Sequence, residues 1–169
     1  MNKHGSFESE RLIFRGINEQ DADCLVKWRS NPEFYKYFKK PAPITKENHI
    51  EWYKKKYLND PFRFDYIIID KASGRKIGYV GVSNLNINDK TFEVNYIIGE
   101  VEFQRRGFAS ESIITIVDLM FSEGFLTAYA EIHKDNFASI KTVQKIQFYK
   151  FSEQGDFIKF ARKYNEKVL

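Results

Sequence analysis

The segment 104–109 carries the residue types best suited to chemistry in this sequence. It reads Gln-Arg-Arg-Gly-Phe-Ala and stands between a predicted strand and a predicted amphipathic helix. A helix N-terminus offers unpaired backbone N–H groups and partial positive charge, and Gly107 lets the backbone approach a ligand closely. Arg105 and Arg106 add full charges suited to phosphate. The pattern predicts an anion site; an exposed arginine-rich loop without a ligand is the alternative.

The elements around this loop alternate between strands and helices. Hydrophobic periodicity, caps and turn residues predict strands over 11–15, 64–69, 76–85, 91–98, 127–132, 148–151 and 156–164. They predict helices over 18–30, from Thr45 to about residue 58, over 110–122 and from Asn136 to about residue 146. The breaker pair Asn31-Pro32 is expected to end the first helix. The order predicts a mixed α/β (α+β) sheet with helices on both faces.

Composition excludes several classes of protein. The chain has 169 residues, of which 43% are hydrophobic and 17% aromatic, so it can bury a core; without linkers or repeats, residues 1–169 are expected to form a single domain. No apolar run reaches the roughly 20 residues of a membrane span, and residues 1–10 lack a signal core, so we expect a cytoplasmic protein without membrane contact. Cys24 stands alone and excludes an internal disulfide framework; we expect it in the core.

The charge pattern bears on the partner. The net charge of +4 and pI near 9.0 suit an anionic small molecule. Nucleic-acid binding is not expected, because no basic stripe with interleaved aromatic residues is present. His4, His49 and His133 show no ligand spacing, so no metal site is expected.

Two blocks of the sequence resemble the GNAT acetyltransferase superfamily. Segment 104–109 matches the family's Gln/Arg-x-x-Gly-x-Gly/Ala signature, and the flanking residues 92–111 look like its strand-loop-helix block. Residues 136–148 resemble the second block, Asn-x-x-Ser/Ala followed by Lys-x-Gly-Phe, with Gln147 at the usual glycine position. The resemblance extends over about 11–164.

The resemblance implies a splayed central strand pair, 91–98 and 127–132, that receives the pantetheine arm of acetyl-CoA. Backbone groups near Ile98 and Gly99 are expected to bind the pantetheine amides and to polarise the thioester carbonyl. Asn136 and Ser139 match positions that contact the pantetheine. The pyrophosphate is expected on Gln104, Arg105, Arg106, Gly107, Phe108 and Ala109.

The implied reaction is direct attack of a primary amine on the acetyl thioester. Glu93 is the candidate general base, at a strand position where relatives often carry a catalytic glutamate, and His133 is a further candidate. Many relatives place a tyrosine general acid where this chain has Val143, so that mechanism does not carry over. Ser139 and Tyr149 are the candidates for contacting the leaving sulfur.

Substrate choice is expected to come from the first two helices and their loop, through Trp28, Arg29, Tyr35, His49 and Trp52. This region is similar to the branches that acetylate ribosomal-protein N-termini and nucleotide-linked amino sugars. The basic, aromatic segment 36–40 favours the amino-sugar nucleotide and opposes a polyamine.

Other interpretations stay open. The acceptor is a small-molecule amine or a peptide N-terminus, and the protein a monomer or homodimer. A non-catalytic acyl-CoA sensor is an alternative, motivated by the missing tyrosine. A domain whose arginine loop binds an acidic partner is another.

Overall fold

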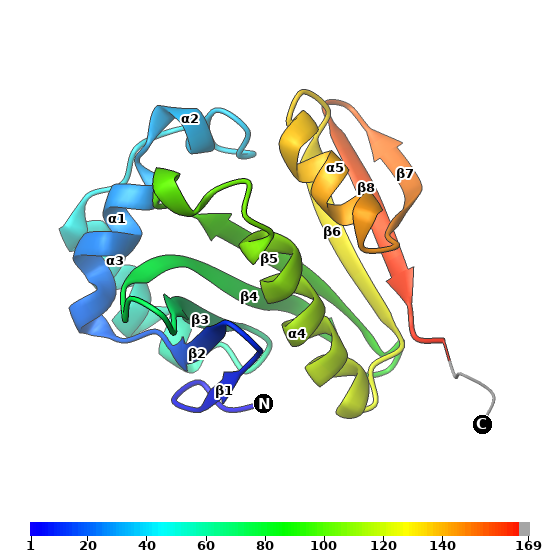
Figure 1. Cartoon of the computed structure of the whole chain (residues 1–169), viewed down its shortest axis with the longest axis horizontal. Helices are drawn as coiled ribbons and strands as arrows, with labels where there is room; N and C mark the ends of the chain where they lie inside the picture. Colours follow the sequence, from blue (N-terminus) through cyan, green and yellow to red (C-terminus); the bar gives the residue numbers. More distant parts are fainter. Residues whose placement is uncertain (166–169) are drawn as a thin grey trace.

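A single eight-stranded sheet organises the chain. The computed structural model describes residues 1–165, and the strands follow the order β1-β2-β3-β4-β5-β6-β8-β7 (Figure 1). Every neighbouring pair is antiparallel except β5–β6, which is parallel. The predicted mixed, mainly antiparallel sheet is therefore confirmed. The strands are β1 Ser6–Glu8, β2 Leu12–Gly16, β3 Phe64–Asp70, β4 Lys76–Asn86, β5 Thr91–Ile98, β6 Thr127–His133, β7 Tyr149–Gln154 and β8 Phe157–Lys163.

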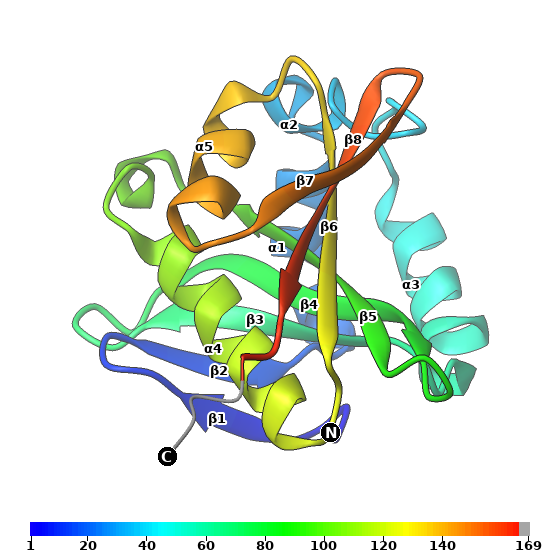
Figure 2. The same ribbon diagram turned by 90° about the vertical axis from the view of Figure 1, so that its right-hand side faces the viewer.

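Helices cover both faces of the sheet, as predicted. Figure 2 shows α4 Phe108–Ser122 and α5 Phe137–Lys145 on one side, with α3 Lys46–Lys55 on the other. Each face has its own core. The larger cluster lies under α4 and α5, and the smaller one packs α1 Ala22–Arg29 and α3 against the opposite face. None of the described helices is both long enough and apolar enough to cross a membrane.

Three local differences separate the structure from the pattern. The edge strand β1 was not predicted, because three residues carry too little periodicity. Asn31-Pro32 does not start a loop: Asn31 accepts the Glu33 N–H and proline occupies the first turn of α2 Pro32–Tyr35. A 3₁₀ turn at Glu19–Asp21 precedes α1, because Asn18 and Asp21 form a capping box there.

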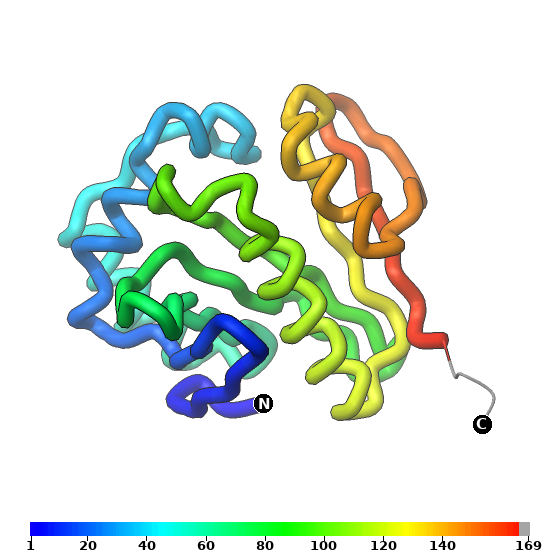
Figure 3. The backbone as a smooth tube through the Cα atoms, in the orientation of Figure 1, coloured from blue at the N-terminus to red at the C-terminus, as the bar shows by residue number. Residues whose placement is uncertain are grey.

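The strands β5 and β6 separate after three residues. They pair only from Thr91↔Thr127 to Glu93↔Tyr129, and Figure 3 shows the two traces diverging beyond that point. Along its whole length β6 pairs instead with β8. The sheet thus opens at its centre, and the outer half of β5 has no strand neighbour on its β6 side.

Candidate active site

The loop before α4 presents a row of backbone donors. Gly107 caps the helix in the left-handed region at φ 83°, and Arg105 also has a positive φ of 59°. Among the described residues, no hydrogen bond uses the backbone N–H groups of residues 105–110. The side chain of Gln104 donates to the carbonyl of Ile98 at 3.0 Å, which ties the loop to the end of β5. This geometry can bind a phosphate or pyrophosphate.

A second anchor holds the helix start from the β2 side. Glu111, in the first turn of α4, accepts from Ser9 at 2.7 Å and from Arg11 Nε at 2.7 Å. Arg11 also donates to the carbonyl of Arg106 at 3.1 Å and lies over the Phe108 ring. Burial alone would raise the pKa of Glu111, but its bonds with Ser9 and Arg11 lower it. The acid is thus occupied, while Arg105 and Arg106 are exposed.

Gly99, which was expected to bind the pantetheine amides through its backbone, has a structural role instead. Its N–H donates to the carbonyl of Ile77 at 2.8 Å, so it is not free for a ligand. A side chain at Gly99 would lie 2.2 Å from the indole of Trp28. Since antiparallel bonding alternates along a strand, the backbone groups of Tyr96 and Ile98 point away from β4 toward the opening. The free backbone groups there are those of Tyr96 and the N–H of Ile98, because the Ile98 carbonyl already accepts from Gln104.

A cavity of about 300 Å³ lies where the strands diverge. Of the predicted site residues, it collects Arg29, Glu93, Asn136 and Ser139. The cavity also takes in His133, the further candidate for the base, and Tyr37 and Phe38 of the segment 36–40 that was expected to bear on the acceptor. Lining residues that were not predicted are Arg63, Tyr79, Ser83, Asn95 and Tyr96. The cavity is lined from both faces of the sheet, because Glu93 and Asn95 face the α1 side while Tyr96 faces α5.

Glu93 stands at the last paired position before the strands separate. Its Oε2 accepts from Asn84 Nδ2 at 2.9 Å. Across the opening, Nδ1 of His133 accepts the backbone N–H of Asp135 at 3.2 Å, which places the proton of neutral His133 on Nε2. A carboxylate and an imidazole therefore line the same cavity: Glu93 can take a proton from an amine, whereas Nε2 of neutral His133 carries a proton and is a hydrogen-bond donor.

The hydroxyl of Tyr96 is buried and unoccupied. It lies close to Ser139 and Thr142 of α5, without a hydrogen bond of normal geometry to either. Burial raises the pKa of Tyr96 to about 12, against the opposing effect of those hydroxyls. Tyr96 is therefore a protonated donor beside Ser139. Val143 is fully buried in the core, as predicted.

Tyr149 is not brought to this cavity. It starts the outer strand β7, is 45% exposed and lines a separate hollow with Asp118 and Phe121. Because β7 is the edge strand beyond β8, Tyr149 lies outside the lining of the opening, a placement that does not favour its predicted contact with the leaving sulfur. Gln147, just before it, adopts φ 69°, which explains a usual glycine there.

Four of the five expected acceptor residues lie outside the cavity lining. Trp28 is 1% exposed and donates to Glu100 at 2.8 Å, and His49 is 4% exposed in the α3 packing. Trp52 stacks near His49 and Tyr57, and Tyr35 lies on α2 away from the opening. Trp28, His49 and Trp52 pack within the helices and against the sheet, and Arg29 alone of the five lines the cavity.

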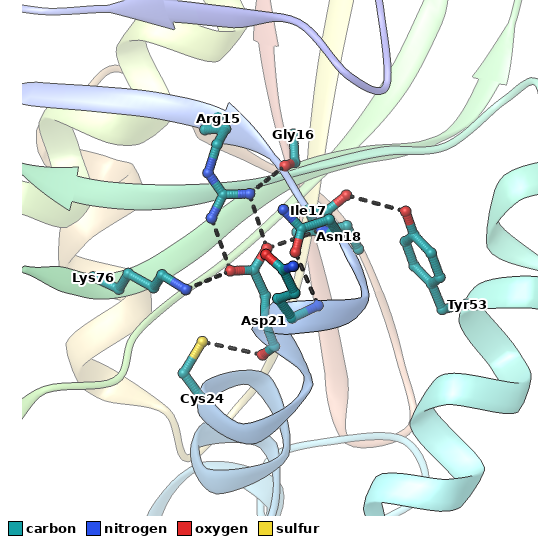
Figure 4. A network of polar contacts seen from close by, with 9 residues as sticks. Arg15, Gly16, Ile17, Asn18, Asp21, Cys24, Tyr53 and Lys76 are labelled. Carbon is teal, nitrogen blue, oxygen red and sulfur yellow. Dashed lines mark hydrogen bonds and ion pairs between the residues drawn. The ribbon is translucent and has the colours of Figure 1, made fainter.

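A polar network fixes the helix that carries Arg29 (Figure 4). The buried carboxylate of Asp21 accepts from Arg15 at 2.8 and 2.9 Å, from Lys76 at 2.7 Å and from the Asn18 N–H at 2.9 Å. Burial alone would raise its pKa, but the bonds from Arg15 and Lys76 hold the pKa of Asp21 below its usual value. The start of α1 is thereby locked to β2 and β4. Cys24 is half-buried beside it, and its thiol faces the Asp21 carbonyl.

Metal-ligating side chains do not gather in the described part of the chain: no three His, Cys, Asp or Glu residues are placed to hold an ion there. The polar groups at the opening are hydroxyls, amides and single charges, which suit an organic ligand.

Comparison with known proteins identifies the family. The acetyltransferase (GNAT) domain model matches residues 11–149. An uncharacterized protein of Methanocaldococcus jannaschii is 31% identical over 85% of this chain, which spans only 29% of that protein. An uncharacterized N-acetyltransferase, p20, of Bacillus licheniformis is 28% identical over 84% of this chain and 81% of its own length.

Solved structures share the fold. A domain from Methanocaldococcus jannaschii superimposes with a TM-score of 0.80 at 27% identity, covering 95% of this chain and all of that one. The spermidine N-acetyltransferase of Vibrio cholerae, solved with CoA and spermine, gives 0.80 at 20% identity, covering 92% and 96%. The chain therefore belongs to the GNAT acetyltransferase family.

Proposed function

We propose that the protein transfers an acetyl group from acetyl-CoA to a primary amine by direct attack within a ternary complex. One observation carries this proposal: the cavity between β5 and β6 is lined from both faces of the sheet. A co-substrate on the α4 and α5 side and an acceptor on the α1 side can therefore meet without a covalent enzyme intermediate.

The residues present fit a phosphate-bearing co-substrate. The free N–H groups of residues 105–110 and the exposed Arg105 and Arg106 would hold its pyrophosphate. Backbone groups of Ile98 and Tyr96 would bind its amides, with Asn136 and Ser139 on the opposite side. When bound, acetyl-CoA supplies an activated acyl group.

The chain's own groups then perform three tasks. Glu93 takes the proton of the acceptor ammonium, since a free amine is mostly protonated at neutral pH, and the Nε2–H of His133 across the opening is a donor for an acceptor oxygen. A backbone N–H of β5 stabilises negative charge on the carbonyl oxygen. The hydroxyls of Ser139 and Tyr96 are the donors for the leaving sulfur.

The acceptor we favour is a nucleotide-linked amino sugar. Support comes from the segment after α2, whose Tyr37 and Phe38 line the cavity and whose Lys39 reaches across it to Glu131. Aromatic rings and lysines at one rim suit a base and a diphosphate. A peptide N-terminus is the second candidate, favoured by fold neighbours named as ribosomal-protein acetyltransferases.

The first experiment is a thermal shift with acetyl-CoA, CoA and acetate side by side. A ligand at 100 times its Kd adds about 2.7 kcal/mol. We expect both CoA species to raise the Tm and acetate to leave it unchanged. The same titration on Gly107→Asp and Arg106→Glu should show no shift, because each places a negative charge in the row of donors.

Gly74→Asp is the matched control, since Gly74 has a similar positive φ of 68° in an open turn. If Gly74→Asp also lost CoA binding, the cause would be the change in the protein's net charge and not the loop before α4. Thiol release would then be screened with amino-sugar nucleotides and N-terminal peptides. CoA binding without turnover on any amine would favour the acyl-CoA sensor. If CoA does not bind at all, the arginine loop as a contact for an acidic partner would be favoured.

A further inference from the structure

Arg29 is a half-buried cation that forms no ion pair in residues 1–165; the nearby carboxylate of Asp65, with which it interacts electrostatically, is paired with Arg63. Its Nε is fully buried and has no acceptor in residues 1–165. Its two terminal nitrogens donate no hydrogen bond within the same residues, and its side chain lines the cavity. A buried N–H without an acceptor is costly, so Nε of Arg29 calls for a ligand atom that accepts from it.

The other charges at the cavity have partners, with one exception. Arg63 pairs with Asp65 at 2.8 Å, and Lys39 pairs with Glu131. The exception is Glu93, which accepts from the Asn84 amide and forms no ion pair in residues 1–165; Lys39, which pairs with Glu131, also lies within its electrostatic range. One positive and one negative charge without an ion pair in these residues thus line the same cavity.

Two other polar side chains that line the cavity with Arg29 also lack a hydrogen-bond partner among the described residues. Asn95 Oδ1 is buried without a donor in the described chain, and the Tyr79 hydroxyl makes no hydrogen bond there. Burial raises the pKa of Tyr79, and the nearby charge of Arg29 opposes that rise. Arg29 and Tyr79 therefore offer neighbouring donors on the α1 face of the sheet.

The register of β4 and β5 separates these two charges. Glu93 lies opposite Ser83, whereas Tyr79, beside Arg29, is four residues further along β4 on the same face. At about 3.3 Å per residue, that is roughly 13 Å of strand. An acceptor whose amine and anionic group stand on adjoining carbons could not reach both Glu93 and Arg29 unless the two side chains turned toward each other.

We propose that Arg29 binds an oxyanion of the acceptor, a phosphate or a carboxylate, on the order of 10 Å from the amine that faces Glu93. This rests on the proposed function and narrows its substrate class. The acceptor carries both signs of charge with a spacer between them. Polyamines are repelled by Arg29, and α-amino acids are too short. A phosphorylated or nucleotide-linked amino sugar has the required form.

The test compares acceptors that differ only in the anionic group. Glucosamine 6-phosphate and glucosamine form the phosphate arm, and 6-aminohexanoate and hexylamine the carboxylate arm. In the wild type we expect kcat/KM for the anionic member of at least one arm to exceed its neutral partner by about 10- to 100-fold, the worth of a hydrogen bond to a charged group. The arm that shows it identifies the oxyanion.

Variants assign that preference to one residue. Arg29→Gln should reduce it to within about twofold, and Arg29→Lys should keep part of it. Because Arg29 makes no hydrogen bond in the described residues, Arg29→Gln should not lower the Tm. Lys55→Gln is the control: it removes an exposed cation of α3 that pairs only with Glu51 there, and should leave the preference intact.

A binding readout separates this proposal from the proposed function. Ligand-observed NMR with the four compounds and no acetyl-CoA should show the anionic members bound by the wild type and released by Arg29→Gln. Binding of this kind without turnover would keep the oxyanion site and refute the transferase role. Turnover without any anionic preference, or an equal loss for both members in Arg29→Gln, would overturn the oxyanion site alone.

Discussion

Asp21→Asn is the sharpest single test of how α1 is held in place. The change removes one negative charge from a fully buried carboxylate and keeps its shape. Arg15 and Lys76 lose their ion-pair partner, and the new amide N–H₂ group faces donors instead of an acceptor. Because α1 also carries Arg29, a loss of stability at the start of this helix would also disturb the acceptor side of the cavity.

The magnitude follows from burial and exposure. Removing one partner of a buried ion pair costs about 3–5 kcal/mol. Here Arg15 and Lys76 keep 31% and 41% of their side chains exposed, so water compensates part of the loss. We therefore expect a loss of about 2–3 kcal/mol in the free energy of unfolding, lower than for a fully buried pair. That is a fall in Tm of roughly 4–12 °C for a chain of this size.

The assay is urea unfolding of both proteins from pH 7 down to the acid limit of the native state. The pKa of Asp21 is lowered in the fold, so its stabilisation is complete above the unfolded pKa near 3.9 and is lost as the pH falls through the folded value. The difference between wild type and Asp21→Asn should be constant from about pH 5 to 7 and shrink below about pH 4.

The control is Asp23→Asn, two residues away on the same helix. Asp23 is 79% exposed and pairs with an exposed Lys46, so its loss should cost under about 1 kcal/mol at any pH. The reasoning fails if Asp21→Asn costs no more than this control, or if its cost does not change with pH.

Three further predictions concern the cavity and its supports. Gly99→Ala should cost at least about 1–3 kcal/mol in urea unfolding, because the methyl group would lie 2.2 Å from the Trp28 indole; an unchanged midpoint would mean that Trp28 can move aside. Gln147→Gly should stabilise the fold by up to about 1 kcal/mol, since the strain of φ 69° exceeds the entropy that glycine loses. A lower Tm would contradict that account. Glu93→Gln should reduce kcat/KM by about 10²- to 10⁴-fold while leaving the Kd for acetyl-CoA unchanged; a comparable rate in the variant would move the base elsewhere, with His133 next to be replaced.

The loop proposed for the co-substrate is built from local signals. Fewer than 20 consecutive residues contain Gly107, the two arginines before it and the apolar positions of α4. One segment therefore holds both the backbone donors and the helix that orients them. Asn136 likewise caps α5 through its own side chain, accepting the Ser139 N–H. Such features depend on neighbours in sequence and can be predicted without knowing the fold.

The acceptor side could not be predicted in the same way. Tyr79, Asn95 and Tyr96 belong to strands whose residues alternate between two buried faces, so the pattern does not show which of them meets a cavity. Trp28 and His49 were expected there for their chemistry, but helical spacing turns them into the packing. Whether such a side chain points into the cavity or into the core depends on how α1 and α3 pack against the sheet, and the sequence pattern does not show that packing.

The sequence by itself determined the family, the order of the elements and the loop that can hold a pyrophosphate, because these depend on short-range spacing, caps and glycine conformations. Only the tertiary structure decided where β6 leaves β5, which side chains from the two sheet faces line that opening, and that Arg29 and Glu93 lie there without an ion pair in residues 1–165. The physical reason is that pairing of β6 with β8 competes with its pairing to β5, and that balance depends on the whole sheet.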